Sequence, residues 1–381
     1  MAKALTTEIL VVGAGPTGMT AALAAADCGF DVALMAPKTP QDPRTTALLM
    51  PAIDLLTHLG AWEGAQESAA PLQTMRIVDA TDRLPRAPEI AFDADEIDLD
   101  QFGFNVPNTA LNGALESALA ALGVRWIDAA ANAVAAGAPV RVEAGDATVH
   151  ADFVVAADGS ESIVREAAGI AVRRWTYDQA AFVTTLSHER PHGNTSVEFH
   201  TPAGPFTLVP LPGDRSSLVW VGRPDEAARW AGMDPGPLAR EIERRAFSML
   251  GRMAVDGPRG VIPMEAMVAR AFGRGNIVLV GEAAHRFPPI GAQGLNLGMR
   301  DVTVLHKLLG EARARRSLSG VASAYDRRRT VDVNARTVGV DLLNRSLLSD
   351  LVPLSAARAV ALAAARNSPF LRRQLMRAGL G

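Results

Sequence analysis

Residues 8–29, EILVVGAGPTGMTAALAAADCG, decide the fold of this chain. Four apolar residues follow Glu8, the pattern of a strand that is buried on both faces. Three glycines come next, at positions 13, 15 and 18, and an alanine-rich helix follows from Met19 to Cys28, where Gly29 ends it. Residues 31–35 read as a second buried strand. Strand, glycine turn, helix and strand together predict a βαβ unit.

The glycine spacing predicts a dinucleotide-binding turn. Gly13 permits the tight turn, Gly15 lets the backbone approach a pyrophosphate, and Gly18 allows the helix to pack closely on the strand. The free N–H groups at the start of the helix favour phosphate. The acidic residue that usually binds a ribose hydroxyl at the end of the second strand is replaced by Ala36, so Lys38 or backbone groups are expected to substitute for it.

Composition limits the classes of protein that remain. A length of 381 residues favours two domains, and 48% hydrophobic with 21% charged residues predicts a large core rather than disorder. A net charge of −3 argues against a nucleic-acid partner. Cys28 is the only cysteine, which excludes an internal disulfide, a Cys-rich zinc site and the dithiol flavoprotein reductases, and we expect no metal. The uncharged stretch 9–26 contains the glycine turn and follows an acid, so we expect a cytoplasmic protein without a signal peptide.

Two further motifs lie at the ends of buried strands. One strand runs into Ala157, Asp158 and Gly159. Another, residues 276–280, leads into GEAAHRFPPIGAQGLNLGMRD, residues 281–301. This loop presents an acid at Glu282, is stiffened by prolines, and opens a helix with glycines. Its helix N-terminus points backbone N–H groups at an anion.

Between these motifs the pattern changes. Short strands separated by Gly/Pro turns, within residues 195–221, predict an antiparallel sheet. We therefore expect a nucleotide-binding domain of residues 1–75, 100–172 and 270–345, an inserted substrate domain of residues 76–99 and 173–269, and a C-terminal helical segment, residues 346–381. Residues 84–101 are expected to form a surface excursion, and Asn108 to cap a helix that ends at Leu122.

The three motifs resemble the signatures of the class A FAD-dependent aromatic monooxygenases, over essentially the whole chain and in the right order. Residues 42–48, 204–211 and 217–220 are similar to the ubiquinone-biosynthesis hydroxylase branch in particular. The resemblance implies an α/β fold, with a Rossmann-like FAD-binding domain, an inserted antiparallel β-sheet substrate domain and a helical C-terminus. Ala36 departs from the family pattern, as does Glu282, where Asp is commoner.

The resemblance also assigns roles to residues. The resemblance implies that the first glycine turn binds the pyrophosphate of noncovalent FAD and that Arg44 reaches the same region. It also implies that Asp158-Gly159 supports FAD and the nicotinamide nucleotide. Glu282 accepts hydrogen bonds from the ribityl or phosphate-side hydroxyls, and the start of the following helix presents N–H groups to the N1–C2=O edge of the flavin. The flavin carries the chemistry, and no side chain is expected to be catalytic. The cofactor-binding set is Gly13, Gly15, Thr17, Gly18, Lys38, Arg44, Asn108, Asp158, Gly159, Glu282, Gly291, Gly294, Leu295 and Asn296, with His285 and Pro289 near the flavin.

The sequence leaves two possible roles open for each of two residues. His285 is either a base or a histidine that packs the loop, and Arg165 is either a surface charge or a cofactor contact.

The implied activity is hydroxylation of an aromatic ring of a ubiquinone precursor, through a C4a-hydroperoxyflavin formed from FAD, NADH or NADPH, and O2. The substrate is apolar and aromatic or polyprenylated. No second Gly-x-Gly-x-x-Gly occurs, so the reductant is expected to dock transiently. Two alternatives stand: a flavoenzyme of the same fold that reduces or epoxidises an isoprenoid, and a catalytically silent FAD-binding accessory of a quinone-synthesis complex.

The last thirty residues are basic. Residues 352–381 contain five arginines and no acid, which predicts an amphipathic helix or helix pair. Two interpretations remain open: peripheral contact with the inner face of the membrane or with a quinone-synthesis complex, or packing of a helix whose charged face is solvated.

Overall fold

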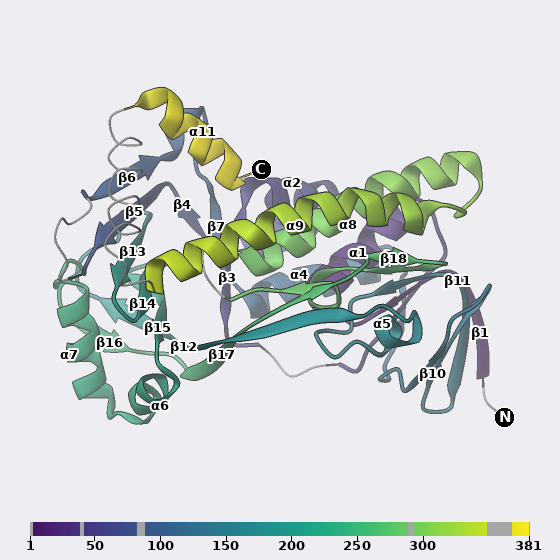
Figure 1. The fold of residues 1–381 in the computed structure, drawn as a ribbon, viewed down its shortest axis with the longest axis horizontal. Coiled ribbons are helices and arrows are strands. Elements are labelled where there is room, and N and C mark those ends of the chain that lie inside the picture. The colour runs from purple at the N-terminus through teal and green to yellow at the C-terminus, as the bar shows by residue number, and fades with distance from the viewer. Residues whose placement is uncertain (1–2, 39–41, 82–87, 289–292, 349–367, 381) are drawn as a thin grey trace.

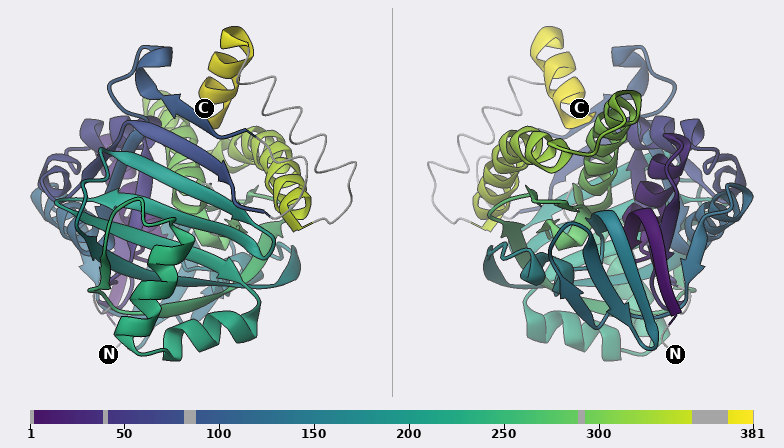
Figure 2. Two further views of the ribbon diagram at one scale, coloured as in Figure 1. Left: turned by 90° about the vertical axis from the view of Figure 1, so that its left-hand side faces the viewer. Right: turned by 90° about the vertical axis from the view of Figure 1, so that its right-hand side faces the viewer.

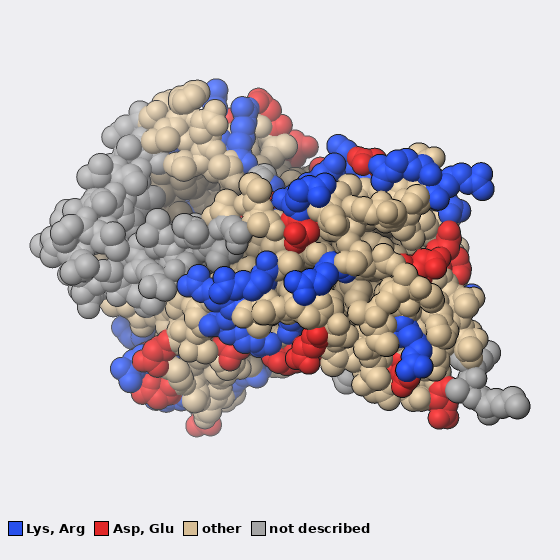
Figure 3. Space-filling model, turned by 45° about the vertical axis from the view of Figure 1, so that its right-hand side comes forward, with Lys and Arg blue, Asp and Glu red and all other residues tan. Residues whose placement is uncertain are grey.

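The computed structural model describes residues 3–38, 42–81, 88–288, 293–348 and 368–380. Two large β-sheets lie side by side, and the long helices α8 (Gln293–Arg315) and α9 (Val321–Leu348) run along the molecule (Figure 1). On the face in Figure 3, Lys and Arg side chains lie next to Asp and Glu side chains, which agrees with a net charge near zero.

The first sheet contains the predicted βαβ unit. Its strands have the order β18-β19-β11-β1-β2-β8, and the pairs from β19 to β8 are parallel. Helix α1 (Pro16–Asp27) begins three residues earlier than expected, because proline suits the first position of a helix. Strand β18 pairs antiparallel with β19, and β10 pairs antiparallel with both β11 and β9. The strands are β1 (Lys3–Val12), β2 (Val32–Met35), β8 (Arg125–Ile127), β9 (Ala133–Ala135), β10 (Val140–Ala144), β11 (Ala147–Ala156), β18 (Gly273–Arg274) and β19 (Ile277–Leu279).

The second sheet has the order β20-β17-β12-β15-β14-β13-β5-β6, and β16 pairs with β12. It is antiparallel as expected, with one correction: β5 and β13 are parallel. The expectation of a surface excursion at 84–101 is also wrong for residues 90–97, which form β6 and the 3-10 helix η1 (Ala94–Ile97), because Ile90 is buried and pairs with Ile77. The strands are β5 (Thr74–Asp79), β6 (Ile90–Asp93), β12 (Val172–His188), β13 (Thr195–Thr201), β14 (Gly204–Leu211), β15 (Arg215–Gly222), β16 (Met253–Val255), β17 (Gly260–Ala269) and β20 (His285–Arg286).

The two faces of the second sheet differ. One is covered by α6 (Pro224–Gly232) and α7 (Pro235–Arg245), around Trp220 and Trp230 stacked 3.6 Å apart between ring centroids. The opposite face, here called the inner face, carries the small apolar cluster of Ala181, Val183, Val219, Val221 and Met264.

A small third sheet connects the two large ones. It consists of β3 (Thr45–Leu49), β7 (Gly103–Pro107) and β4 (Ala70–Leu72), in the order β3-β7-β4. From β7, the Asn105 amide donates to the Pro210 carbonyl at 2.8 Å and to Ser217 Oγ at 3.1 Å. The third sheet is therefore fastened to the second by a buried polar side chain.

The remaining helices are α2 (Met50–His58), α3 (Glu63–Gln66), α4 (Asn108–Ala121), α5 (Ile163–Ala167), the 3-10 helix η2 (Gly281–Ala283) and α11 (Pro369–Leu380). Asn108 does not cap α4 as expected: Pro107 occupies the cap position, without a side-chain cap. Helix α11 packs near η1, as the two views of Figure 2 also show. Among the described residues, no helix is long and apolar enough to cross a membrane.

Candidate cofactor site

The three sequence motifs meet at one edge of the first sheet. In the parallel register, Val12 lies opposite Ala156, which lies opposite Leu279. The Ala157 N–H donates to the Val12 carbonyl at 2.7 Å, and the Val280 N–H donates to the Ala156 carbonyl at 2.9 Å. Adjacent parallel strands end at the same edge, so the turns at 13–18, 157–159 and 281–282 are neighbours. This is the edge at which α/β sheets bind ligands.

The first glycine turn forms an open cradle for an anion. Gly13 has φ +107°, and a Cβ there would collide with the Ala157 carbonyl; a Cβ on Gly18 would collide with the Gly13 carbonyl. Gly15, by contrast, is the N-cap of α1, has no side-chain cap, and has open space within 4 Å of its Cβ direction. The N–H groups of the first helical turn, which have no partner within a helix, therefore face accessible space. The residues fit the pyrophosphate of FAD.

Thr17 holds the first and third motifs together. A Cβ on Gly298 would lie 2.5 Å from Thr17 Oγ1, and one on Gly281 would lie 3.1 Å from it. The Thr17 side chain thus occupies the space that these two glycines leave, at the junction of α1, η2 and α8. This places the N-termini of α1 and α8 side by side.

The first residues of α8 differ in their surroundings: the backbone at Gly294 is accessible, whereas the Asn296 side chain is held by hydrogen bonds. Gly294 is exposed with nothing near its Cβ direction, and Leu295 is half-buried. Asn296 is buried: its Oδ1 accepts from the Leu49 N–H at 2.9 Å and its Nδ2 donates to the Ala47 carbonyl at 2.8 Å. Its side chain therefore anchors α8 to β3. Gly291 and Pro289, also predicted for this site, lie outside the described residues.

Arg44 and Glu282 lie close enough for their charges to interact. The Arg44 guanidinium pairs with the Asp42 carboxylate, with Nη2 and Oδ2 2.7 Å apart. This hydrogen bond, together with the charges of Asp42 and Glu282, raises the pKa of Arg44, although burial works in the opposite direction. Glu282 is exposed in η2. Burial alone would raise the pKa of Asp42, but hydrogen bonds from Arg44 and Asn108 hold it below its ordinary value.

Asn108 acts through Asp42. Its Nδ2 donates to Asp42 Oδ2 at 2.8 Å, and its Oδ1 accepts from Thr46 Oγ1 at 2.6 Å. The predicted cofactor residue therefore orients the Asp42–Arg44 pair against β3, a role that spacing alone does not indicate.

Asp158 caps α5. Its carboxylate accepts from Ser162 Oγ at 2.5 Å and from the Val164 N–H at 3.3 Å, and burial raises its pKa. Gly159 has φ +84° and open space beyond it. The second motif therefore presents Gly159 and backbone toward the edge, while the Asp158 carboxylate is used locally.

Arg165 is buried, so the surface-charge alternative is wrong. It is 2% exposed, and its guanidinium donates to the Ala283 carbonyl at 2.9 Å and the Ser160 carbonyl at 2.8 Å. Burial lowers its pKa. The side chain ties the second motif to the third.

His285 belongs to a buried ionic network. Its Nε2 hydrogen-bonds to Asp301 Oδ2 at 2.7 Å, the same oxygen accepts from the Gly281 N–H at 2.8 Å, and Arg329 Nε donates to Asp301 Oδ1 at 2.7 Å. His285 Nδ1 has no hydrogen-bond partner among the described residues. The network packs the loop, which is one of the two roles expected of His285. Sequence reasoning gave no role to Asp301 or Arg329; an acid within an otherwise apolar helical face was the available signal.

The place of the usual ribose ligand is filled by backbone contacts. The buried Ala36 uses its carbonyl to accept from Trp126 Nε1 at 2.9 Å. Lys38 is exposed, and its N–H donates to Asp128 Oδ1 at 2.9 Å. Asp128, directly after β8, is thus the acid beside the end of β2, which sequence reasoning missed.

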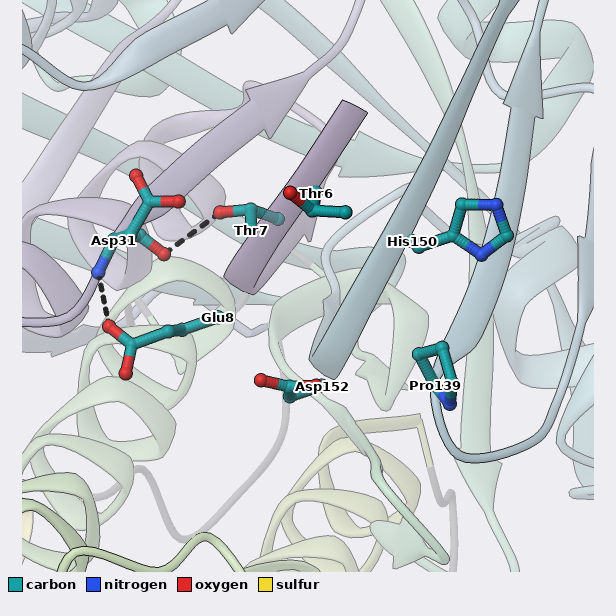
Figure 4. Close-up of a pocket in the computed structure, with 7 residues that line it drawn as sticks. All are labelled: Thr6, Thr7, Glu8, Asp31, Pro139, His150 and Asp152. Carbon is teal, nitrogen blue, oxygen red and sulfur yellow. Dashed lines mark hydrogen bonds between the residues drawn. The ribbon is translucent and has the colours of Figure 1, made fainter. Parts of the chain in front are cut away.

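Two cavities lie outside the cradle. One, of about 290 Å³, is lined by Thr6, Thr7, Glu8, Asp31, Pro139, His150 and Asp152, in the amino-terminal half of β1 and away from the motifs (Figure 4). The other, of about 460 Å³, opens between Pro43 and Thr45 on one side and Thr185, Leu211 and Arg215 on the other. This second cavity lies between the Asp42–Arg44 segment and the second sheet.

Comparison with known proteins agrees with this geometry. The FAD binding domain family matches residues 6–337. The chain is 33% identical to ubiquinone hydroxylase UbiL of Rhodospirillum rubrum, over 98% of this chain and 89% of the relative. It is 30% identical to 3-demethoxyubiquinol 3-hydroxylase of Escherichia coli, over 98% of both chains.

Solved structures share the fold. The p-nitrophenol 4-monooxygenase of Pseudomonas putida superimposes with a TM-score of 0.80 at 19% identity, covering 99% of this chain and 98% of the other. Klebsiella pneumoniae HpxO, solved with FAD and uric acid, gives 0.78 at 19% identity, covering 98% and 96%. The expected architecture is confirmed. The chain belongs to the FAD binding domain family, as a class A FAD-dependent monooxygenase.

Proposed function

We propose that this protein hydroxylates the aromatic ring of a ubiquinone precursor, using FAD, O2 and NADH or NADPH. The observation that carries the proposal is the convergence of three motifs, separated by more than a hundred residues, on the uncapped start of α1. The ubiquinone hydroxylase of Rhodospirillum rubrum and the 3-demethoxyubiquinol 3-hydroxylase of Escherichia coli align with almost the whole chain. Neither isoprenoid chemistry nor a silent accessory role is favoured by these relatives.

The chain's own residues bind and orient the cofactor. The first turn of α1 binds the pyrophosphate, and the exposed Glu282 carboxylate accepts hydrogen bonds from cofactor hydroxyls. The open first turn of α8, at Gly294, offers N–H groups and a positive dipole end to negative charge on the reduced ring. When bound, FAD supplies the redox chemistry that couples the nicotinamide reductant and O2 to ring hydroxylation.

The inner face of the second sheet is the proposed substrate wall. Its apolar cluster, which contains the half-buried Val183 and Val219, suits an aromatic ring and excludes water from it. We assign this wall to a substrate domain of residues 76–99 and 173–269, and the cofactor site to residues 1–75, 100–172 and 270–345. The cavity beside Pro43 is the proposed approach for the ring.

A peripheral membrane contact, or contact with a quinone-synthesis complex, completes the proposal. Helix α11, within residues 352–381, exposes Phe370 at 74%, Leu375 at 48% and Leu371 at 38%. These side chains suit the inner face of the membrane, from which an apolar quinone precursor would be delivered.

The test uses purified full-length protein with FAD. We expect NAD(P)H oxidation that depends on the ubiquinone precursor, with one oxygen of ¹⁸O2 recovered on its ring. Flavin that is never reduced would identify an accessory protein, and an altered isoprenoid chain with an intact ring would support the other alternative. Recovery of bound NAD without flavin would contradict the cofactor assignment.

Two glycine variants make this test specific. Gly15→Ala places a methyl group in the open cradle, at a φ of −67° that alanine tolerates, so FAD binding should fall while the fold is kept. Gly113→Ala is the matched control: it also has open space but lies on α4, and it should keep both flavin and activity.

A further inference from the structure

Four potential metal ligands gather on the surface at the far end of α1 from the cofactor cradle. Asp27 is the last residue of α1, Cys28 follows it, His58 ends α2, and His306 lies on α8. At 1.5 Å per residue, the twelve residues of α1 put this cluster about 18 Å from the glycine turn. The cluster is therefore separate from the proposed active site.

The donor atoms surround one carboxylate oxygen. Asp27 Oδ2 lies 2.7 Å from His306 Nε2 and 3.5 Å from His58 Nε2. Donor atoms of Asp27, Cys28 and His306 all lie within 4.8 Å of one another, whereas His58 reaches this group through Asp27. The Cys28 thiol rests against α8, with Sγ 3.5 Å from the His306 carbonyl oxygen.

The two spacings around the Asp27 carboxylate are close to those of a tetrahedral zinc site. With metal–ligand bonds of about 2.0–2.3 Å, neighbouring ligand atoms are about 3.4–3.7 Å apart. The His58–Asp27 distance already has this value, and the His306–Asp27 contact needs to open by less than an ångström. Imidazole, carboxylate and thiolate are the ligand types that zinc prefers.

The surroundings also favour a cation. Two helices, α1 and α2, end at the cluster, and each brings the partial negative charge of its C-terminus. Side-chain exposures of 22% for His306, 38% for Asp27 and 60% for His58 leave a path for the ion. Histidine hydrogen-bonded to aspartate is also an ordinary surface ion pair, so the experiment has to separate the two.

We propose that Asp27, Cys28 and His306 form a surface site for Zn²⁺, with His58 turning toward them as the fourth ligand, and that the ion joins the ends of α1 and α2 to α8. The Cys28 thiol gives up its proton to solvent as the zinc–sulfur bond forms. Spacing along the chain gave no sign of this site, because its ligands are separated by up to 279 residues.

The experiment is calorimetric titration of Zn²⁺ into chelator-treated, FAD-loaded protein. We expect one zinc ion per chain, and at least about tenfold weaker binding in His58→Gln and in His306→Gln. His150→Gln is the matched control, because His150 lies in the acidic cavity of Figure 4 and outside the cluster. Flavin content and thermal melts establish that the variants are folded.

Cobalt reports the thiolate directly. Co²⁺ should produce the bands of a tetrahedral site together with a sulfur charge-transfer band, which Cys28→Ser removes. Absence of stoichiometric Zn²⁺ binding, or binding that survives His306→Gln and is lost in His150→Gln, overturns the proposal. A cobalt spectrum unchanged by Cys28→Ser overturns the four-ligand site.

Discussion

Polar residues at the carboxyl edge of the first sheet fall into two groups. Asp158 and Asn296 use their side chains to hold backbone, at the start of α5 and along β3. Glu282 instead keeps an exposed carboxylate beside the cradle, close enough to Arg44 for its charge to contribute to the raised pKa of that arginine. Unlike the Asp158 carboxylate, the Glu282 carboxylate is therefore available to a ligand.

Glu282→Gln should weaken FAD binding. A charge-assisted hydrogen bond contributes about 1.5–3 kcal/mol, or about 10- to 150-fold in affinity. Glu282→Asp should be milder, because a water molecule can bridge the missing methylene. Fluorescence titration of the apoprotein with FAD measures both, alongside thermal melts. Glu116→Gln, on the exposed face of α4, is the control for the same chemical change. Unchanged affinity in Glu282→Gln would remove this residue from the site.

At the scale of elements, helix α8 contributes both to the cofactor cradle and to the packing of the loop before it. Its first turn faces the cradle, and its interior acid Asp301 binds the loop through Gly281 and His285, and α9 through Arg329. The side chains of Asp301, His285 and Arg329 are at most 2% exposed. Because water cannot solvate these groups, the charge of Asp301 is compensated by its buried partners. The loop that carries Glu282 is therefore positioned by a helix that follows it in sequence.

Asp301→Asn should destabilise the protein by about 3 kcal/mol, the low end for a broken buried pair, since Asp332 still contacts Arg329. Burial works to raise the pKa of Asp301, but His285 and Arg329 hold it below its ordinary value. The carboxylate therefore stabilises the fold above the unfolded pKa of about 3.9, and this contribution is lost as pH falls through the lower folded value. Urea unfolding at several pH values should show the gap between wild type and variant closing on acidification. The exposed Asp100→Asn should show no such gap at any pH; a gap independent of pH in Asp301→Asn would contradict this account.

At the scale of the whole molecule, the C-terminus returns to the edge of the second sheet. Arg372 pairs with Glu96 and lies over the Phe92 ring, 4.9 Å from its centroid, while Met376 is buried beside Ile97. This arginine, expected as part of a basic surface, is thus used for packing. The packing interpretation therefore holds for this side of α11, while the membrane contact stays a proposal that rests on the apolar side chains exposed on the other side.

Membrane association should depend on that exposed face. Phe370→Ser with Leu375→Ser should reduce sedimentation with anionic vesicles about tenfold or more, since burying one large apolar side chain contributes roughly 1.5–3 kcal/mol. Val331→Ser, an equally exposed apolar residue on α9, is the control. Protein lacking residues 352–381 should also remain in the supernatant. Equal sedimentation of all forms at low salt would refute the membrane contact.

The cofactor class and the fold were determined by the sequence itself, because their requirements are local. A turn that only glycine can make, at Gly13, and a strand of four apolar residues each impose their structure on neighbouring residues. The third motif likewise carries its acid and its helix start within twenty-one residues. Such motifs can be recognised in the sequence without knowing which residues pack against them.

Tertiary structure alone decided the burial of Arg165, the network of Asp301 with Arg329, the contact of Asn108 with Asp42, and the parallel pairing of β5 with β13. Their partners lie between 28 and more than a hundred residues away in the chain. From sequence alone, an ionisable side chain is predicted to be exposed, because burying a charge without a partner is costly. The partner that makes burial possible is known only from the folded chain.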